Sequence, residues 1–224
     1  MAPILSKEQA RNVYDRLGAR QDSQAFYEDP AIAVLIAHAA FDKAEAVFEF
    51  GCGTGRFAER ILKTHLPARC SYRGLDISPT MVGLAGARLG RWGDRAEVVL
   101  TDGSVALEAA DDGYDRFVSN YVLDLLGDAD TRALLAEAHR ILRPGGLLCL
   151  VGLTHGTTPV SRLVSRAWTG VHAIGPKLLG GCRPIEIRDA LSAEAWRLRH
   201  HGVIRRLGIS SEVVVATARN RIPV

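Results

Sequence analysis

The chain has 224 residues, of which 47% are hydrophobic and 24% are charged, and its formal net charge is +3. This length and composition are typical of one soluble globular domain with a full core. The charge is uneven, because residues 155–224 carry 11 Lys/Arg and 4 Asp/Glu, but no basic run is dense enough for a nucleic-acid tail.

Signals for export and for membrane spanning are missing from the sequence. The start, M-A-P-I-L-S-K-E-Q, has no basic segment followed by an apolar core. The longest apolar runs, at 31–36 and 147–153, are shorter than the roughly 18–20 residues that a spanning helix needs. The four cysteines show no C-x-x-C pair and no metal-ligand spacing. We therefore expect a cytoplasmic protein with buried, reduced cysteines and no metal.

From residue 46 onward, strand-like and helix-like segments alternate along the chain. A helix is predicted at 56–65, where the apolar residues share one face. A second begins at Ser78-Pro79, because serine can cap it and proline suits the first turn. A third, at 130–142, stops at R-P-G-G, since proline cannot continue the helix. The predicted strands are 46–50, 71–77, 97–101, 114–119, 147–153, 203–209 and 213–218.

This order of elements predicts an α/β fold with a doubly wound, mostly parallel sheet. The strand at 147–153 is apolar throughout, as expected when helices cover both faces of a sheet. The last two strands are too close in sequence for a helical crossover. We expect a tight turn at Ser210-Ser211 to join them, so that they pair antiparallel.

The stretch V-F-E-F-G-C-G-T-G, from Val47 to Gly55, places three glycines at alternate positions directly after a strand. Glycine costs backbone entropy, so this pattern suggests that a ligand approaches the backbone closely. In doubly wound sheets ligands bind beyond the carboxyl ends of the strands, beside free helix N-termini. The dinucleotide fingerprint G-x-G-x-x-G is the alternative. Here Arg56 and Phe57 stand where its last small residue would be, which disfavours NAD.

Polar residues that could bind a nucleoside follow the next two strands. Asp76 comes about twenty residues after the glycines, where a carboxylate can accept both ribose hydroxyls; a surface or capping role is the alternative. Asp102-Gly103 ends the third strand, where a carboxylate can receive the amino group of adenine. Met81 would offer a soft apolar surface to the base, or would pack in the core.

Five motifs carry a family resemblance: V-F-E-F-G-C-G-T-G-R-F, G-L-D-I-S-P-T-M, T-D-G, S-N-Y-V-L and R-I-L-R-P-G-G-L-L. Over residues 46–153 the chain resembles the class I S-adenosylmethionine-dependent methyltransferases, especially the small-molecule branch with the ubiquinone/menaquinone-type enzymes. The resemblance implies a Rossmann-like sheet of seven strands, mostly parallel with an antiparallel last strand. It also implies S-adenosyl-L-methionine as cofactor and S-adenosyl-L-homocysteine as product. The implied cofactor-binding residues are Tyr14, Glu49, Gly51, Gly53, Gly55, Asp76, Ile77, Met81, Asp102, Gly103 and Asn120.

By that resemblance, the glycines approach the methionine part of the cofactor and Glu49 lies near its amino group. Asn120 would contact the cofactor near the transferred methyl group. Tyr14 belongs to an N-terminal helix that would fold over the cofactor as a lid, with plain helix packing as the alternative. The acids Glu49, Asp76 and Asp102 would repel a pyrophosphate, but they suit a ligand with an ammonium group, hydroxyls and a base amine.

Methyl transfer requires mainly that nucleophile, methyl group and sulfur be aligned and that water be excluded. A general base is needed only if the acceptor loses a proton as it attacks. Tyr121 after the fourth strand and His155 after the fifth are the candidates, although a lone loop histidine is more often a surface residue. Asp124 is expected to cap or solvate the next helix.

The segment 157–182 has Trp168 and aliphatic residues at helical spacing, with serines and arginines opposite. Packing on the sheet is the ordinary interpretation, and a greasy acceptor or a membrane surface is the alternative. We expect the acceptor to be enclosed between this insertion and the N-terminal helix. The predicted organisation is a single domain with a helical lid (1–45), a cofactor-binding core (46–153), an acceptor-side insertion (154–200) and closing strands (201–224).

The function predicted is methyl transfer to a small or lipophilic organic acceptor, without a nucleic-acid partner. Peripheral membrane contact stays open as an alternative. A dehydrogenase is disfavoured by the glycine spacing. A non-catalytic, cofactor-binding partner subunit is one alternative, and a protein or RNA methyltransferase is another. The motif S-N-Y-V-L stands where N/D-P-P-Y would favour planar amino groups in nucleic acid. The acceptor, the atom methylated, the use of a base and the oligomeric state stay open at this point.

Overall fold

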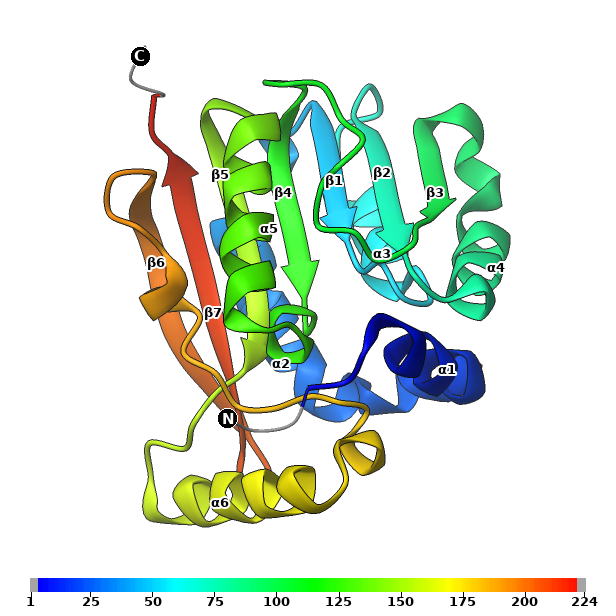
Figure 1. Cartoon of the computed structure of the whole chain (residues 1–224). Coiled ribbons are helices and arrows are strands. Elements are labelled where there is room, and N and C mark those ends of the chain that lie inside the picture. The colour runs from blue at the N-terminus through cyan, green and yellow to red at the C-terminus, as the bar shows by residue number, and fades with distance from the viewer. Residues whose placement is uncertain (1–3, 221–224) are drawn as a thin grey trace.

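The computed structural model describes residues 4–220 and confirms the predicted α/β architecture (Figure 1). One seven-stranded sheet has the order β3-β2-β1-β4-β5-β7-β6, with β7 antiparallel to both of its neighbours. The strands are β1 (Ala46–Phe50), β2 (Ser71–Asp76), β3 (Ala96–Leu100), β4 (Tyr114–Asn120), β5 (Leu142–Leu153), β6 (Trp196–Arg206) and β7 (Ile209–Ala218). The α-helices are α1 (Lys7–Leu17), α2 (Ala25–His38), α3 (Arg56–Thr64), α4 (Pro79–Leu89), α5 (Asp128–Ile141) and α6 (Pro159–Ile174). The short 3-10 helices are η1 (Gly18–Gln24), η2 (Phe41–Lys43), η3 (Gly90–Arg95), η4 (Leu123–Leu125), η5 (Pro176–Leu179) and η6 (Arg188–Ala190).

Two hydrophobic cores cover the two faces of the sheet. Successive strand residues point to opposite faces, so Val47 packs with α2 and α3 whereas Phe48 packs with α5. Cys149 and Leu148 of β5 divide between the same two cores. Because helices occupy both faces, the open place for a ligand is at the ends of the strands.

The two closing strands differ from the prediction in their lengths and in the position of the turn that joins them. β6 begins at Trp196, within the segment assigned to the insertion, and both strands are longer than expected. The turn lies at Leu207-Gly208, where φ is +50° and +82°. Two successive positive φ angles match the right-handed twist of a two-residue hairpin. Ser210 and Ser211 therefore belong to β7, and the turn predicted there was wrong.

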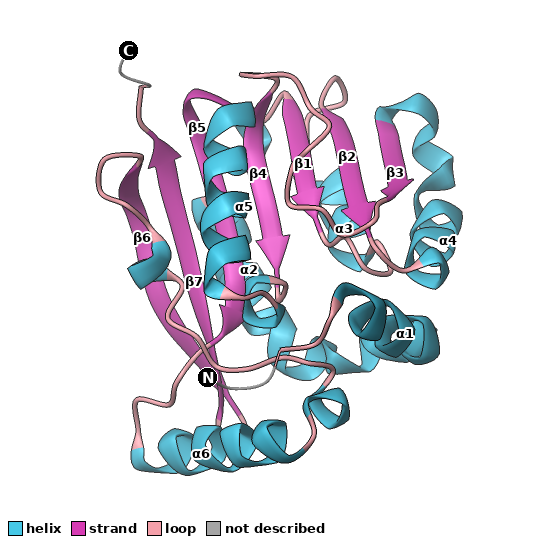
Figure 2. Cartoon of the chain, in the orientation of Figure 1, coloured by secondary structure: helices cyan, strands magenta, loops and turns pink. Residues whose placement is uncertain are grey.

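The insertion forms α6, but its apolar stripe does not pack on the sheet as expected. Val160 and Leu163 are 68% and 70% exposed, whereas Ser161 is 1% exposed. The strands β1 to β4 end toward the edge of the sheet where α1 and α6 lie (Figure 2). Across residues 4–220, every helix is too short or too polar to cross a membrane.

Candidate functional site

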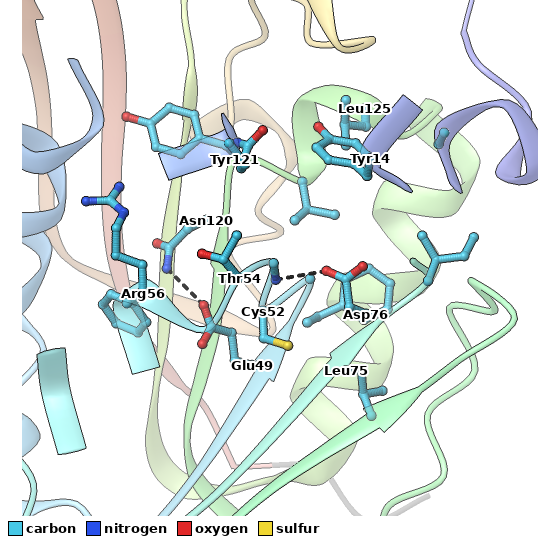
Figure 3. Close-up of a pocket in the computed structure, with 18 of the residues that line it drawn as sticks. Tyr14, Glu49, Cys52, Thr54, Arg56, Leu75, Asp76, Asn120, Tyr121 and Leu125 are labelled. Atoms are coloured by element: carbon cyan, nitrogen blue, oxygen red, sulfur yellow. Dashed lines mark hydrogen bonds between the residues drawn. The ribbon is translucent and has the colours of Figure 1, made fainter. Parts of the chain in front are cut away.

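A cavity of about 530 Å³ lies beyond the carboxyl ends of β1, β2 and β4. This volume falls in the range of small-molecule and cofactor sites, roughly 300–1,000 Å³. Side chains and backbone from the glycine loop, the end of β2, the loop after β4 and the N-terminal segment meet around it (Figure 3). The predicted site residues that line it are Tyr14, Glu49, Gly51, Gly53, Asp76, Ile77, Gly103, Asn120 and Tyr121.

The three glycines after β1 all have positive φ, at +79°, +54° and +75°, but they serve different contacts. A Cβ atom on Gly51 would lie 2.3 Å from Val122 Cγ2, and one on Gly55 would lie 3.1 Å from Ala85. A Cβ atom on Gly53 would meet nothing within 4 Å. Gly51 and Gly55 therefore permit close packing of the chain, and Gly53 presents bare backbone to the cavity.

Asp76 fixes the glycine loop to the end of β2. Its carboxylate accepts hydrogen bonds from the backbone N–H of Gly53, at 2.8 Å, and of Ser78, at 2.9 Å. Burial raises the pKa of this carboxyl, and the backbone donors partly oppose that shift. Each oxygen keeps a further lone pair, so Asp76 can hold the loop and still accept from hydroxyls of a ligand in the cavity.

Glu49 and Asn120 place hydrogen-bond acceptors at the floor of the cavity. Glu49 is 1% exposed and accepts from the Tyr72 hydroxyl, at 2.6 Å, and from Asn120 Nδ2, at 3.3 Å (Figure 3). Asn120 Oδ1 is buried without a hydrogen-bond partner. Burial raises the pKa of Glu49 to about 8. A buried carboxyl and an unpaired amide oxygen fit a ligand that brings an ammonium group.

This geometry predicts that cofactor affinity depends on pH. Since the pKa of Glu49 is about 8 in the free protein, its carboxyl carries a proton at neutral pH. A bound ammonium group favours the ionised form, so binding below pH 8 should release a proton and tighten as the pH rises, by up to about tenfold per unit. Above about pH 8 the gain ends, because the Glu49 carboxyl is then already ionised in the free protein and binding releases no proton.

Titration calorimetry with S-adenosylhomocysteine in buffers of different ionisation enthalpy measures the proton release directly. Glu49→Gln should abolish the release while leaving the Tyr72 contact to an oxygen acceptor. Equal affinity and no proton release from about pH 6 to pH 8 in the wild type would contradict the placement of the ammonium group at Glu49.

The N-terminal segment is tied to the glycine loop by charges that the motif search did not select. Arg56 follows the glycines, and its guanidinium lies 2.7 Å from Glu28 of α2 and also pairs with Asp29. Asp22 of η1 accepts from Thr54 Oγ1, at 2.5 Å, and pairs with Arg88 of α4. In the sequence, the only sign of this network was the acidic residues at 22, 28 and 29 together with Arg56, which stands where the dinucleotide fingerprint would have a small residue. This network closes one side of the cavity.

The other end of the cavity is mainly apolar and aromatic. Tyr14 of α1 lines it, and its hydroxyl lies 3.9 Å from Cys182 Sγ. Tyr121, with φ +55°, also lines it, but its hydroxyl donates to Ser211 Oγ, at 2.9 Å. Burial raises the pKa of Tyr121, so the phenol stays protonated. The apolar residues at this end are Ile4, Leu5, Leu125 and Leu126.

Four predicted site residues do not line the cavity. Met81 is fully buried in the core, and Gly55 packs against α4. Asp102 is exposed, with its carboxylate accepting from the Ser104 N–H at 2.7 Å. His155 lies exposed after β5, outside the cavity lining.

Two further residues differ from their predicted surroundings. Asp124 neither caps nor solvates α5, whose N-cap is Gly127. It is fully buried and accepts from the Leu153 N–H at 3.3 Å, and burial raises its pKa to about 7. Trp168 of the insertion donates to the Cys182 carbonyl and does not line the cavity. The insertion contacts the acceptor end through Cys182, beside Tyr14 of α1, and through Arg183, which donates to the Leu126 carbonyl at 2.6 Å.

Comparison with known proteins matches residues 47–146 to a family model described as a methyltransferase domain. A malonyl-[acyl-carrier protein] O-methyltransferase of Hahella chejuensis is 32% identical over 61% of this chain and 52% of its own. A ubiquinone/menaquinone biosynthesis C-methyltransferase of Paracoccus denitrificans is 33% identical over 48% of this chain and 42% of its own. The chain thus spans about half the length of these curated relatives.

The fold is similar to that of a solved N-methyltransferase, NodS of Bradyrhizobium japonicum, in complex with S-adenosyl-L-homocysteine. The TM-score is 0.70 at 18% identity, and the match covers 94% of this chain and 99% of that one. The sheet order, the cavity at the strand ends and the matched domain agree with one another. Residues 47–146 therefore match a methyltransferase domain, and they lie in a fold similar to that of a methyltransferase solved with S-adenosyl-L-homocysteine.

Proposed function

We propose that this protein transfers the methyl group of S-adenosylmethionine to a small or lipophilic organic acceptor. The observation that carries the proposal is the cavity itself. Its floor offers a buried carboxyl and an unpaired amide oxygen at Glu49 and Asn120, and its opposite end is lined by Tyr14 and aliphatic side chains. The first set suits the amino-acid end of the cofactor, and the second suits an apolar acceptor.

The residues present fit the cofactor in three parts. Glu49 and Asn120 would accept from its ammonium group, and the bare backbone at Gly53 leaves room for its methionine chain. Asp76 would accept from the ribose hydroxyls, and Ile77 beside it would contact the base. When bound, the cofactor supplies an activated methyl group with a good leaving group.

The protein's contribution to the reaction is alignment and exclusion of water. The ion pairs of Arg56 with Glu28 and Asp29 hold α2 against the glycine loop, and Tyr14 covers the cavity from α1. Neither of the two side chains predicted as a general base is placed for that role. The Tyr121 hydroxyl is engaged with Ser211 and His155 lies outside the cavity lining. We therefore favour an acceptor that reacts without losing a proton to either side chain.

The names of the relatives support the acceptor class. One names a malonyl group on a carrier protein and the other names quinone biosynthesis. The aliphatic lining at Leu5, Leu125 and Leu126 suits a lipophilic acceptor better than a charged base or a peptide amide.

The test is transfer of a labelled methyl group from S-adenosylmethionine into a cell extract, followed by separation of small molecules, protein and RNA. Label in the organic-extractable fraction is expected, and an Asp76→Ala variant should not produce it. Label confined to RNA or protein would contradict the proposed organic acceptor and identify a macromolecular one instead. Cofactor binding without any transfer would support the non-catalytic partner subunit instead.

A further inference from the structure

Helix α6 turns its large apolar side chains toward solvent. Leu163 and Ile174 are 70% and 87% exposed, and Val160 is 68% exposed. The face that packs on the rest of the protein instead carries Ser161 and His172, each 1% exposed. Burial of apolar surface is favourable, so a helix that exposes its apolar face indicates a site of interaction with a protein or a membrane.

Two neighbouring segments extend this apolar surface. Leu178 of η5, just after α6, is 74% exposed, and Leu207 at the tip of the β6–β7 hairpin is 75% exposed. The hairpin tip is in contact with α6, since a Cβ atom on Gly208 would lie 2.7 Å from a methyl group of Val164. We define the α6 patch as the exposed large apolar residues of these three segments: Val160, Leu163, Val171, Ile174, Leu178 and Leu207.

The charges around the α6 patch have one sign. Arg162 and Arg166 are exposed on α6, and Arg205 and Arg206 directly precede Leu207. None of the four arginines forms an ion pair within residues 4–220. Residues 138–185 contain no Asp or Glu. The helix therefore combines an apolar strip with adjacent basic side chains and no acid.

We propose that the α6 patch docks the protein onto the anionic surface of a lipid bilayer. Amphipathic elements with a basic polar side and exposed aliphatic residues bind there, with the apolar side chains at the acyl boundary and the basic ones at the phosphates. A second copy of the chain fits less well, because a two-fold contact would set the same arginines against one another.

The position of the patch relates it to the cavity. Helix α6 lies at the same edge of the sheet as α1 (Figure 2). Trp168 of α6 donates to the Cys182 carbonyl at 2.9 Å, and Cys182 Sγ lies 3.9 Å from the hydroxyl of Tyr14, which lines the cavity. Docking through α6 would bring the apolar end of the cavity near the bilayer. The inference stands on the surface alone and does not depend on the proposed methyl transfer.

Sedimentation of the whole chain with phospholipid vesicles, without cofactor or acceptor, tests the proposal. Vesicles of phosphatidylcholine are compared with vesicles in which about one third is phosphatidylglycerol. Binding to the anionic vesicles should be at least about tenfold stronger, and high salt should weaken it. Equal binding to the two kinds of vesicle, or binding to neither, would overturn the proposal.

Variants of exposed residues assign the binding to the patch without disturbing the core. The double substitutions Leu163→Ser/Ile174→Ser and Arg162→Glu/Arg166→Glu should each reduce binding to anionic vesicles by about tenfold or more. Leu100→Ser and Arg132→Glu, exposed residues on β3 and α5, are the matched controls and should leave it unchanged. If the chain did not bind vesicles but formed a concentration-dependent dimer, and Leu163→Ser/Ile174→Ser disrupted that dimer, the patch would instead be a contact with a second copy.

Discussion

Replacing Gly53 with valine is expected to abolish binding of S-adenosylmethionine while leaving the fold in place. A Cβ atom at this position meets no protein atom within 4 Å, because the space in front of Gly53 is the cavity. A branched side chain would therefore occupy the volume that the methionine part of the cofactor needs. The loss should exceed about 100-fold in the dissociation constant, or roughly 2.7 kcal/mol. Calorimetric titration with S-adenosylhomocysteine measures it.

Gly93 provides a matched control for this substitution. Its φ of +56° is close to the +54° of Gly53, and a Cβ atom there also meets nothing within 4 Å, but it lies in η3 outside the cavity lining. Gly93→Val should also carry backbone strain from its positive φ, about 1–3 kcal/mol of unfolding free energy, and keep cofactor affinity. If Gly53→Val bound as tightly as Gly93→Val, the loop would not approach the ligand.

Replacing Asp76 with alanine should weaken cofactor binding by about 1.5–3 kcal/mol, the range for hydrogen bonds to a charged group. The substitution removes the proposed acceptor for the ribose hydroxyls. It also releases the Gly53 N–H, which the carboxylate holds at 2.8 Å. Both effects act on the same site, so the dissociation constant should rise by about 10- to 100-fold.

Substitution of Asp102 is the control for a general effect of losing a negative charge. It was also predicted to bind the cofactor, but its carboxylate is exposed and accepts from Ser104 N–H. We expect Asp102→Ala to change the dissociation constant by less than about threefold, well below one hydrogen bond to a charged group. An unchanged constant in a folded Asp76→Ala protein would remove Asp76 from the site, and a large change in Asp102→Ala would return Asp102 to it.

The parts of the fold that the sequence predicted are those set by local patterns. The strand at Ala46–Phe50, the glycines after it and the capped helix at Ser78-Pro79 each depend on neighbouring residues, and the structure contains all three. The order of alternating strands and helices was enough to predict the parallel sheet. The positions of Glu49 and Asp76 at the cavity could be predicted because each residue stands at a fixed place relative to the end of its strand.

The parts that the sequence could not predict depend on contacts between distant segments. Nothing local to Arg56 indicates that it pairs with Glu28 and Asp29, which come from a helix nearly thirty residues earlier. Met81 has the right place in its motif, yet packing of α4 on the sheet buries it completely. For α6, periodicity revealed an apolar stripe but gave no information on which face the rest of the chain would cover.

The central claim is that the cavity binds S-adenosylmethionine with its amino group at Glu49 and Asn120 and its ribose at Asp76. A crystal structure of the chain with S-adenosyl-L-homocysteine tests this most directly. The account predicts the ligand nitrogen within about 2.7–3.2 Å of a Glu49 carboxylate oxygen or Asn120 Oδ1, and the ribose hydroxyls at the same range from the Asp76 carboxylate. A ligand bound elsewhere, or bound in this cavity with its adenine at Glu49, would contradict it.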